Sequence, residues 1–200
     1  MAIAPRILGG VEMPPVGLGC MVLSHAYGNP LPAQAGKKVL ERAVDVGYVH
    51  FDTAAMYGFG SNETLLGHVL RPYRDRIFLA SKCGMTGVNG VRTVDGRPET
   101  IRATCEEALE RLQADVIDLY YLHRIDPDVP LEDTVGAMSE LIGAGKIKGI
   151  GLSEVSAKTT RCRITGATEP SRWEIAWRSS ARVWPGTSST GPVSPGRRRM

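Results

Sequence analysis

The sequence predicts an α/β fold in which parallel strands alternate with crossover helices. Five short apolar runs recur along residues 1–156, and they are nearly continuous, as expected for strands that are covered on both faces. The segments between these runs carry apolar residues at three- and four-residue spacing, which indicates helices with one buried side. Regular alternation of the two patterns favours a parallel sheet.

The first fifteen residues predict a small hairpin that turns at Gly9-Gly10. We expect this hairpin to cap a layer of the fold rather than to carry chemistry. The apolar runs that follow it predict buried strands at 16–21, 48–54, 77–82, 116–123 and 147–154.

The spacing of apolar residues between these strands predicts four helices, at 34–47, 62–73, 99–113 and 131–144. In the third helix, Ile101, Cys105 and Leu109 recur on one side. Pro72 is expected to stop the second helix. Gly145 follows the fourth helix and suits the left-handed backbone that often ends a helix.

The last part of the chain follows different compositional rules. Residues 1–156 contain 15 Lys and Arg against 19 Asp and Glu, whereas residues 157–200 contain 9 against 2. Arginine, tryptophan, proline and glycine are frequent there, and neither strand nor helix periodicity continues. We therefore divide the chain into an α/β body at 1–157 and an irregular tail at 158–200.

Three interpretations of this tail stay open. Arginine and tryptophan together are typical of segments that bind nucleic acid or an acidic membrane surface. The composition also fits a disordered extension. Finally, it fits translation of GC-rich DNA in a shifted reading frame, and the abrupt change of composition favours this third interpretation. We therefore expect no nucleic-acid or membrane partner.

Other bounds come from what the sequence lacks. No apolar run is long enough to span a membrane, and the first residues do not resemble a signal peptide, so a cytoplasmic setting is expected. The four cysteines are far apart and match no zinc-binding spacing, so no metal site is expected. The length of 200 residues allows one sizeable core.

Four residues that carry proton chemistry lie at or just after the ends of successive predicted strands: Asp52, Tyr57, Lys82 and His123. The carboxyl ends of parallel strands meet at one edge of a sheet, where reactive groups gather. A phenol is a weak acid at neutral pH, but a close ammonium makes it a better proton donor. A carboxylate compensates such an ammonium, and an imidazole can hold a substrate oxygen.

Each of these residues has an ordinary structural explanation when taken alone. A strand-end aspartate is often a cap, a tyrosine often packs, a lysine is often solvated and a histidine is often a structural residue. Their arrival together at three successive strand ends favours a shared active site.

An ordered series of motifs resembles the aldo-keto reductase family. The series is "VGLGCM", "FDTAAMYG", "LASK", "DLYYLH" and "GKIKGIGLSE", within residues 8–157. The resemblance implies a (β/α)₈ barrel of the TIM type that uses NAD(P)H to reduce aldehydes and ketones. Asp52, Tyr57, Lys82 and His123 match the catalytic tetrad of the family, in which the tyrosine gives a proton to the carbonyl oxygen.

The same resemblance implies the residues that hold the cofactor. The backbone around Gly19, Cys20 and Met21 matches the contact that the first strand of the family makes. Ser153 matches a residue that holds the nicotinamide carboxamide, and Glu154 stands where many members have asparagine. NADPH is the expected cofactor, and NADH is not excluded.

Only about five of the eight strand-helix units of such a barrel can be identified in the sequence. We therefore expect a truncated or frameshifted chain that binds NADPH weakly or not at all. Two alternatives stay open: a non-catalytic protein that keeps the fold, and a product without stable function. The sequence leaves the carbonyl substrate, the choice between NADPH and NADH and the oligomeric state open.

Overall fold

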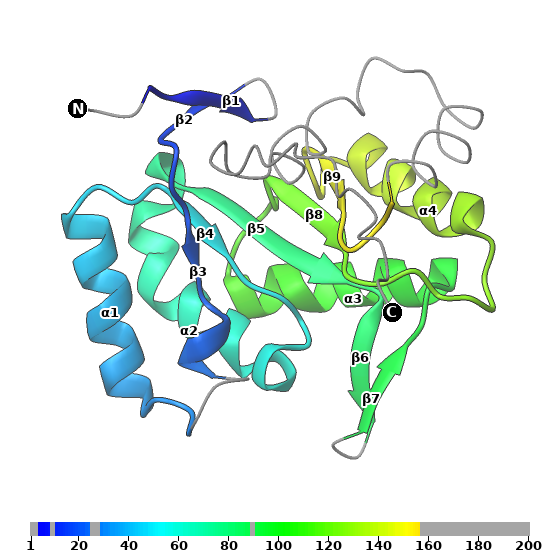
Figure 1. Cartoon of the computed structure of the whole chain (residues 1–200), viewed down its shortest axis with the longest axis horizontal. Coiled ribbons are helices and arrows are strands. Elements are labelled where there is room, and N and C mark those ends of the chain that lie inside the picture. The colour runs from blue at the N-terminus through cyan, green and yellow to red at the C-terminus, as the bar shows by residue number, and fades with distance from the viewer. Residues whose placement is uncertain (1–3, 9–10, 25–28, 89–90, 157–200) are drawn as a thin grey trace, which may run out of the picture.

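The computed structural model describes residues 4–8, 11–24, 29–88 and 91–156 (Figure 1). The predicted turn at Gly9-Gly10 and the predicted tail at 158–200 lie outside the described residues. The described part of the chain forms a sheet with four helices and two separate hairpins.

Five parallel strands form the central sheet, in the order β3-β4-β5-β8-β9. The strands are β3 (Leu18–Gly19), β4 (His50–Asp52), β5 (Phe78–Cys83), β8 (Leu119–Leu122) and β9 (Ile150–Leu152). The predicted parallel α/β arrangement is therefore confirmed. Most strands are shorter than the predicted runs because buried turn residues extend the apolar pattern, as Ala54, Ala55 and Met56 do after β4.

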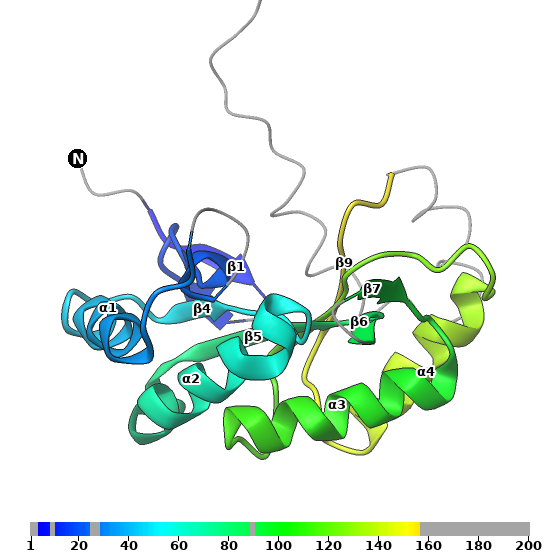
Figure 2. The same ribbon diagram turned by 90° about the horizontal axis from the view of Figure 1, so that it is seen from below.

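Four helices cover one face of this sheet (Figure 2). They are α1 (Ala33–Asp45), α2 (Ser61–Leu70), α3 (Pro98–Leu112) and α4 (Leu131–Gly143). Phe51, Leu79 and Tyr120 belong to the large core cluster that the sheet shares with the helices. Burial of this apolar surface is the main force that holds the helices on the sheet.

Short 3₁₀ helices complete three of the connections: η1 (Met21–Leu23), η2 (Tyr57–Gly60) and η3 (Arg71–Arg76). Pro72 stands in the first turn of η3, directly after α2 ends. A proline is tolerated there because the first turn of a helix leaves its backbone N–H groups without helical partners.

The second face of the sheet carries a smaller apolar cluster of Met13, Phe78, Ala80 and Leu119. Met13 comes from the N-terminal hairpin, in which β1 (Arg6–Leu8) pairs antiparallel with β2 (Val11–Met13). The predicted hairpin is confirmed, and Met13 shows that it packs against this second face.

A second hairpin was not predicted. β6 (Met85–Val88) pairs antiparallel with β7 (Val91–Val94) directly after β5. Its sequence signal is Asn89-Gly90, a dipeptide that favours two-residue hairpin turns. The two hairpins lie at opposite ends of the sheet (Figure 1), and the second lies at the carboxyl ends of the strands.

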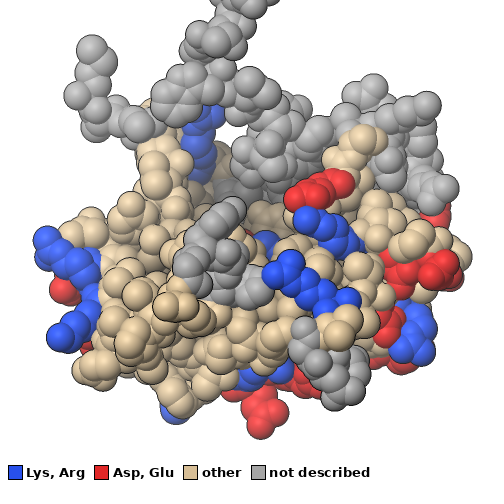
Figure 3. Space-filling view, turned by 60° about the horizontal axis from the view of Figure 1, so that its bottom comes forward, with Lys and Arg blue, Asp and Glu red and all other residues tan. Residues whose placement is uncertain are grey.

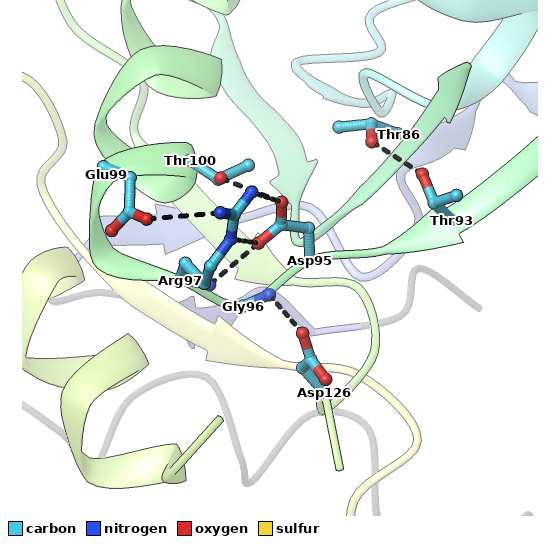
Figure 4. A network of polar contacts seen from close by, with 8 residues as sticks. All are labelled: Thr86, Thr93, Asp95, Gly96, Arg97, Glu99, Thr100 and Asp126. Carbon is cyan, nitrogen blue, oxygen red and sulfur yellow. Dashed lines mark hydrogen bonds and ion pairs between the residues drawn. The ribbon is translucent and has the colours of Figure 1, made fainter. Parts of the chain in front are cut away.

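A polar network fixes the chain where this hairpin enters α3 (Figure 4). The carboxylate of Asp95 accepts hydrogen bonds from the backbone and guanidinium of Arg97 and from the hydroxyl of Thr100. These bonds lower the pKa of Asp95 to about 2, the Arg97 side chain having the largest effect. Asp126, on the loop after β8, accepts a bond of 2.8 Å from the backbone of Gly96. The β6–β7 hairpin and the loop after β8 are thus both bonded to the chain at the start of α3.

No helix in the described part of the chain is long and apolar enough to cross a membrane.

Candidate active site

The parallel register brings three of the predicted residues to adjacent strand ends. Asp52 is the last residue of β4 and pairs with Ala80 of β5. Lys82 lies two residues further along β5, and its backbone pairs with Tyr121 of β8. His123 follows β8 directly and donates a backbone hydrogen bond of 2.9 Å to Cys83. Asp52, Lys82 and His123 therefore meet at the carboxyl edge of the sheet.

Lys82 is buried at the centre of this edge, with a relative exposure of 9%. Its Nζ donates to the carboxylate of Asp52 and to the carbonyl oxygen of Thr53, the second bond measuring 2.7 Å. The same nitrogen lies 4.9 Å from the centre of the Tyr57 ring and 5.9 Å from the centre of the Tyr121 ring. A carboxylate and two aromatic faces thus compensate the buried ammonium.

Tyr57 reaches the same edge from the connection after β4. It begins η2, and its side chain is buried, with 8% relative exposure. The two residues that follow, Gly58 and Phe59, have positive φ angles of 56° and 52°, so the backbone turns directly after Tyr57. The Tyr57 ring meets the His123 ring edge to face, with 5.8 Å between centroids. All four predicted tetrad residues are therefore brought together.

His123 is held as a neutral imidazole. Burial, with smaller contributions from the charges of Lys82, Arg124 and Arg92, lowers its pKa to about 4. The Nδ1 atom is buried and has no hydrogen-bond partner among the described residues. A neutral imidazole can donate one hydrogen bond to a substrate oxygen without adding a full charge to the site.

The predicted cofactor residues of the first strand lie at one end of the same edge. Gly19 is exposed, and among the described residues, its two chain neighbours aside, none has an atom within 4 Å of the position that a Cβ would take there. Cys20 is buried, and burial together with the charge of Asp52 raises the pKa of its thiol to about 12. The Cys20 thiol thus belongs to the core and stays protonated. Met21 begins η1 and is half-buried.

Ser153 and Glu154 follow β9 at the opposite end of the edge. Ser153 is half-buried and donates a backbone hydrogen bond of 3.0 Å to Leu122. Glu154 has a positive φ of 54°, and its carboxylate forms an ion pair of 2.7 Å with Arg124. The carboxylate of Glu154 is therefore engaged with a protein side chain. Figure 3 brings this edge forward and shows basic side chains gathered near the centre of the face.

A buried amide that the sequence did not reveal fastens the loops of the site. Asn62, in the first turn of α2, is fully buried. Its Nδ2 donates to the carbonyl of Cys20 and to the hydroxyl of Ser24, both at 2.9 Å, and its Oδ1 accepts from Thr53 at 2.6 Å. These bonds join the segments that follow β3 and β4. Its only sequence signal is its place directly after the loop that carries Tyr57.

A buried carboxylate, also missed, lies next to it in sequence. Glu63 is fully buried, accepts a hydrogen bond of 2.5 Å from Ser81, and pairs with Arg111 of α3 at 2.7 Å. Burial raises the pKa of Glu63, whereas the charge of Arg111 and the bond from Ser81 oppose that rise. Because Ser81 precedes Lys82 on β5, Glu63 and Arg111 support the strand from its helix side. In the described residues, no cluster of His, Cys, Asp and Glu is able to hold a metal ion.

Comparison with known proteins gives a consistent result. The model of the Aldo/keto reductase family matches residues 15–171. A probable aldo-keto reductase 1 from Glycine max is 44% identical over 164 residues, which cover 80% of this chain and 47% of that protein. The chain thus spans about half the length of this curated relative.

Solved structures give the same pattern. An aldo-keto reductase from Bacillus halodurans, in its holo form, has a TM-score of 0.74 and 28% identity, covering 86% of this chain and 55% of that one. An aldo/keto reductase from Klebsiella pneumoniae, in complex with NADP and acetate, has a TM-score of 0.64 and 30% identity, covering 79% and 52%. These matches confirm the predicted barrel type, of which the described residues form five adjacent parallel strands.

Proposed function

The chain belongs to the aldo/keto reductase family, and we propose that its described residues form the catalytic edge of an NADPH-dependent reductase of aldehydes or ketones. NADH remains the alternative hydride donor in this proposal. One observation carries it: Lys82 lies between the carboxylate of Asp52 and the ring of Tyr57, and the ring of His123 lies against that of Tyr57. This constellation combines a proton donor, a buried cation that activates it and a neutral hydrogen-bond donor.

The edge also fits the nicotinamide end of the cofactor. The exposed backbone at Gly19 leaves open space, Cys20 and Met21 continue that backbone, and Ser153 adds a hydroxyl at the other end of the edge. We propose that these residues hold the nicotinamide and its carboxamide. When bound, NADPH supplies the hydride for the carbonyl carbon.

In this proposal Tyr57 is the general acid that protonates the carbonyl oxygen. The nearby ammonium of Lys82 favours the phenolate that remains after the proton has left. Asp52 compensates the charge of the buried ammonium through the hydrogen bond that it accepts from Lys82. A positioned acid of this kind contributes on the order of 10² to 10⁴ to the rate.

His123 orients the substrate in the same scheme. Its imidazole stays neutral at pH 7 because burial and the surrounding cations disfavour protonation. The ring of His123 lies against the ring of Tyr57. A hydrogen bond from His123 to the carbonyl oxygen would therefore place that oxygen beside Tyr57. The geometry thus supports one oxygen shared by two donors.

The test uses a chimera, because the chain spans only about half the length of its relative. Residues 1–156 of this chain are joined to the second half of the Glycine max relative, which then supplies the remainder of the family fold. We expect the chimera to oxidise NADPH when an aldehyde is added, and the isolated 200-residue chain to bind NADPH weakly. An inactive but folded chimera, beside an active relative, would contradict the proposed function.

A further inference from the structure

We propose that Arg124 and Glu154 form a clamp that positions His123 and Ser153 where the chain leaves β8 and β9. Glu154 acts in this clamp as a positioning residue rather than as a contact for the cofactor. The inference rests on the proposed function for the roles of His123 and Ser153, but the geometry of the clamp stands apart from it.

The clamp joins two loops directly beside the site. Arg124 follows His123, and Glu154 follows Ser153, so each partner is the immediate neighbour of a predicted site residue. The ion pair between them measures 2.7 Å. The same guanidinium nitrogen, Nη1, also donates to the backbone carbonyl of His123 at 3.3 Å. The Arg124 side chain therefore fastens both loops at once.

The last backbone bond between these strands lies just before the clamp. Ser153 donates to the carbonyl of Leu122 at 3.0 Å, and no β8 to β9 pairing is described beyond that point. Beyond that point, the Arg124–Glu154 pair is a polar link between the two loops. Loss of the pair should loosen the loop ends and leave the strands themselves intact.

The energetics of the pair also favour a positioning role. Its side chains are 38% and 67% exposed, and ion pairs of that exposure contribute little to global stability. Yet Glu154 keeps a left-handed backbone, with φ of 54°, which costs a non-glycine residue free energy. Glu154 is thus strained, and its ion pair adds little to the stability of the whole chain. A strained residue of this kind beside a site indicates a local function.

The clamp also sets the charge around the imidazole. Lys82 of β5, Arg92 of β7 and Arg124 on the loop after β8 all act on His123, and the Tyr57 ring packs against it. Glu154 neutralises Arg124 while holding it in place. Removing the guanidinium takes one cation away from the ring and also leaves the carboxylate of Glu154 uncompensated.

The test measures hydrogen exchange and histidine titration by NMR in the 200-residue chain, without cofactor. Glu154→Gln removes the ion pair, and Glu154→Asn does so with a residue that tolerates the left-handed backbone. Glu140→Gln is the matched control, because it removes an equally short, exposed pair of 2.7 Å with Arg102 on α3. We expect the Ser153 amide to exchange about threefold faster or more in both Glu154 variants and to stay unchanged in the control.

The second readout is the pKa of His123, with its resonance identified by loss in His123→Gln. Arg124→Gln should raise this pKa, whereas Arg124→Lys, which keeps the charge, should leave it low. The clamp is refuted if the Ser153 amide exchanges in Glu154→Gln as in the unaltered chain, or if Arg124→Gln leaves the titration unmoved. Neither readout depends on NADPH. An inactive chimera would therefore contradict the proposed function but would not change the outcome of the exchange and titration measurements.

Discussion

The ammonium of Lys82 lies 4.9 Å from the centre of the Tyr57 ring while it donates a hydrogen bond to Asp52. A buried cation thus stands beside the only phenol that the loop after β4 brings to this edge. The carboxylate of Asp52 compensates its charge. This relationship links the stability of the site to its chemistry, because the same pair of charges serves both.

Removing the counter-ion should expose that link. Asp52→Asn leaves the buried ammonium of Lys82 without its carboxylate, and we expect the free energy of unfolding to fall by about 1 to 3 kcal/mol. Urea unfolding at pH 7 measures the change. The exposed pair of Arg102 and Glu140 is the control, since Glu140→Gln should change the same quantity by less than about 0.5 kcal/mol. Equal losses in the two variants would show that the burial of Lys82 has no energetic consequence.

Acidification should destabilise the fold through His123. Its pKa in the folded chain is about 4, below the ordinary value of 6.5, so the unfolded chain binds more protons between these values. The stability that comes from the neutral His123 is therefore fully present above pH 6.5, and it is lost as the pH falls toward 4. Between pH 7 and pH 5, we expect the urea concentration at the midpoint of unfolding to fall less in His123→Gln than in the unaltered chain. Part of the slope should remain, because burial also lowers the pKa of His50; an unchanged slope would contradict the prediction.

Two helical glycines should respond in opposite directions to the same substitution. A Cβ at Gly67 of α2 would lie 2.3 Å from the backbone oxygen of Arg111, so Gly67→Ala must push α2 and α3 apart. We expect a loss of about 2 kcal/mol or more in thermal or urea unfolding. Apart from its own helix, no described residue lies within 4 Å of a Cβ at Gly136 of α4, so Gly136→Ala should stabilise the chain by about 0.5 to 1 kcal/mol. A loss at both positions, or at neither, would contradict the packing described here.

Much of the site was predictable because parallel strands share one carboxyl edge. Asp52, Lys82 and His123 end successive apolar runs, and the regular alternation of strand and helix was enough to bring them together. The chemistry of a phenol beside an ammonium indicated Tyr57 as the proton donor, and the family resemblance matched all four residues to a catalytic tetrad. The sheet confirms the parallel arrangement, and the relatives confirm the family.

Contacts that depend on which face of a strand a residue occupies, or on the register between two strands, were not predictable. Tyr120 and Tyr121 are adjacent and chemically identical, yet Tyr120 is buried toward the helices and Tyr121 lies near Lys82. The alternation of a strand says that they differ, but not which one faces the site. Arg124 and Glu154 are 30 positions apart in sequence and meet only because Leu122 pairs with Leu152.

The buried polar groups of α2 were hidden for a different reason. Asn62 and Glu63 open a predicted amphipathic helix, where polar residues usually face solvent or complete the first turn. Their burial follows from tertiary bonds to Thr53, Ser81 and Arg111. No local pattern reports such bonds, because each partner lies on another element.

The most direct test of the account is the turnover of two tyrosine variants in the chimera. Tyr57→Phe keeps the ring beside Lys82 but removes the hydroxyl, and Tyr121→Phe does the same to the second aromatic neighbour of Lys82. We predict that kcat for aldehyde reduction falls about 10² to 10⁴-fold in Tyr57→Phe, with NADPH affinity unchanged, and stays near the parent value in Tyr121→Phe. Retained turnover in Tyr57→Phe, or equal losses in both variants, would contradict the assignment of Tyr57 as the proton donor.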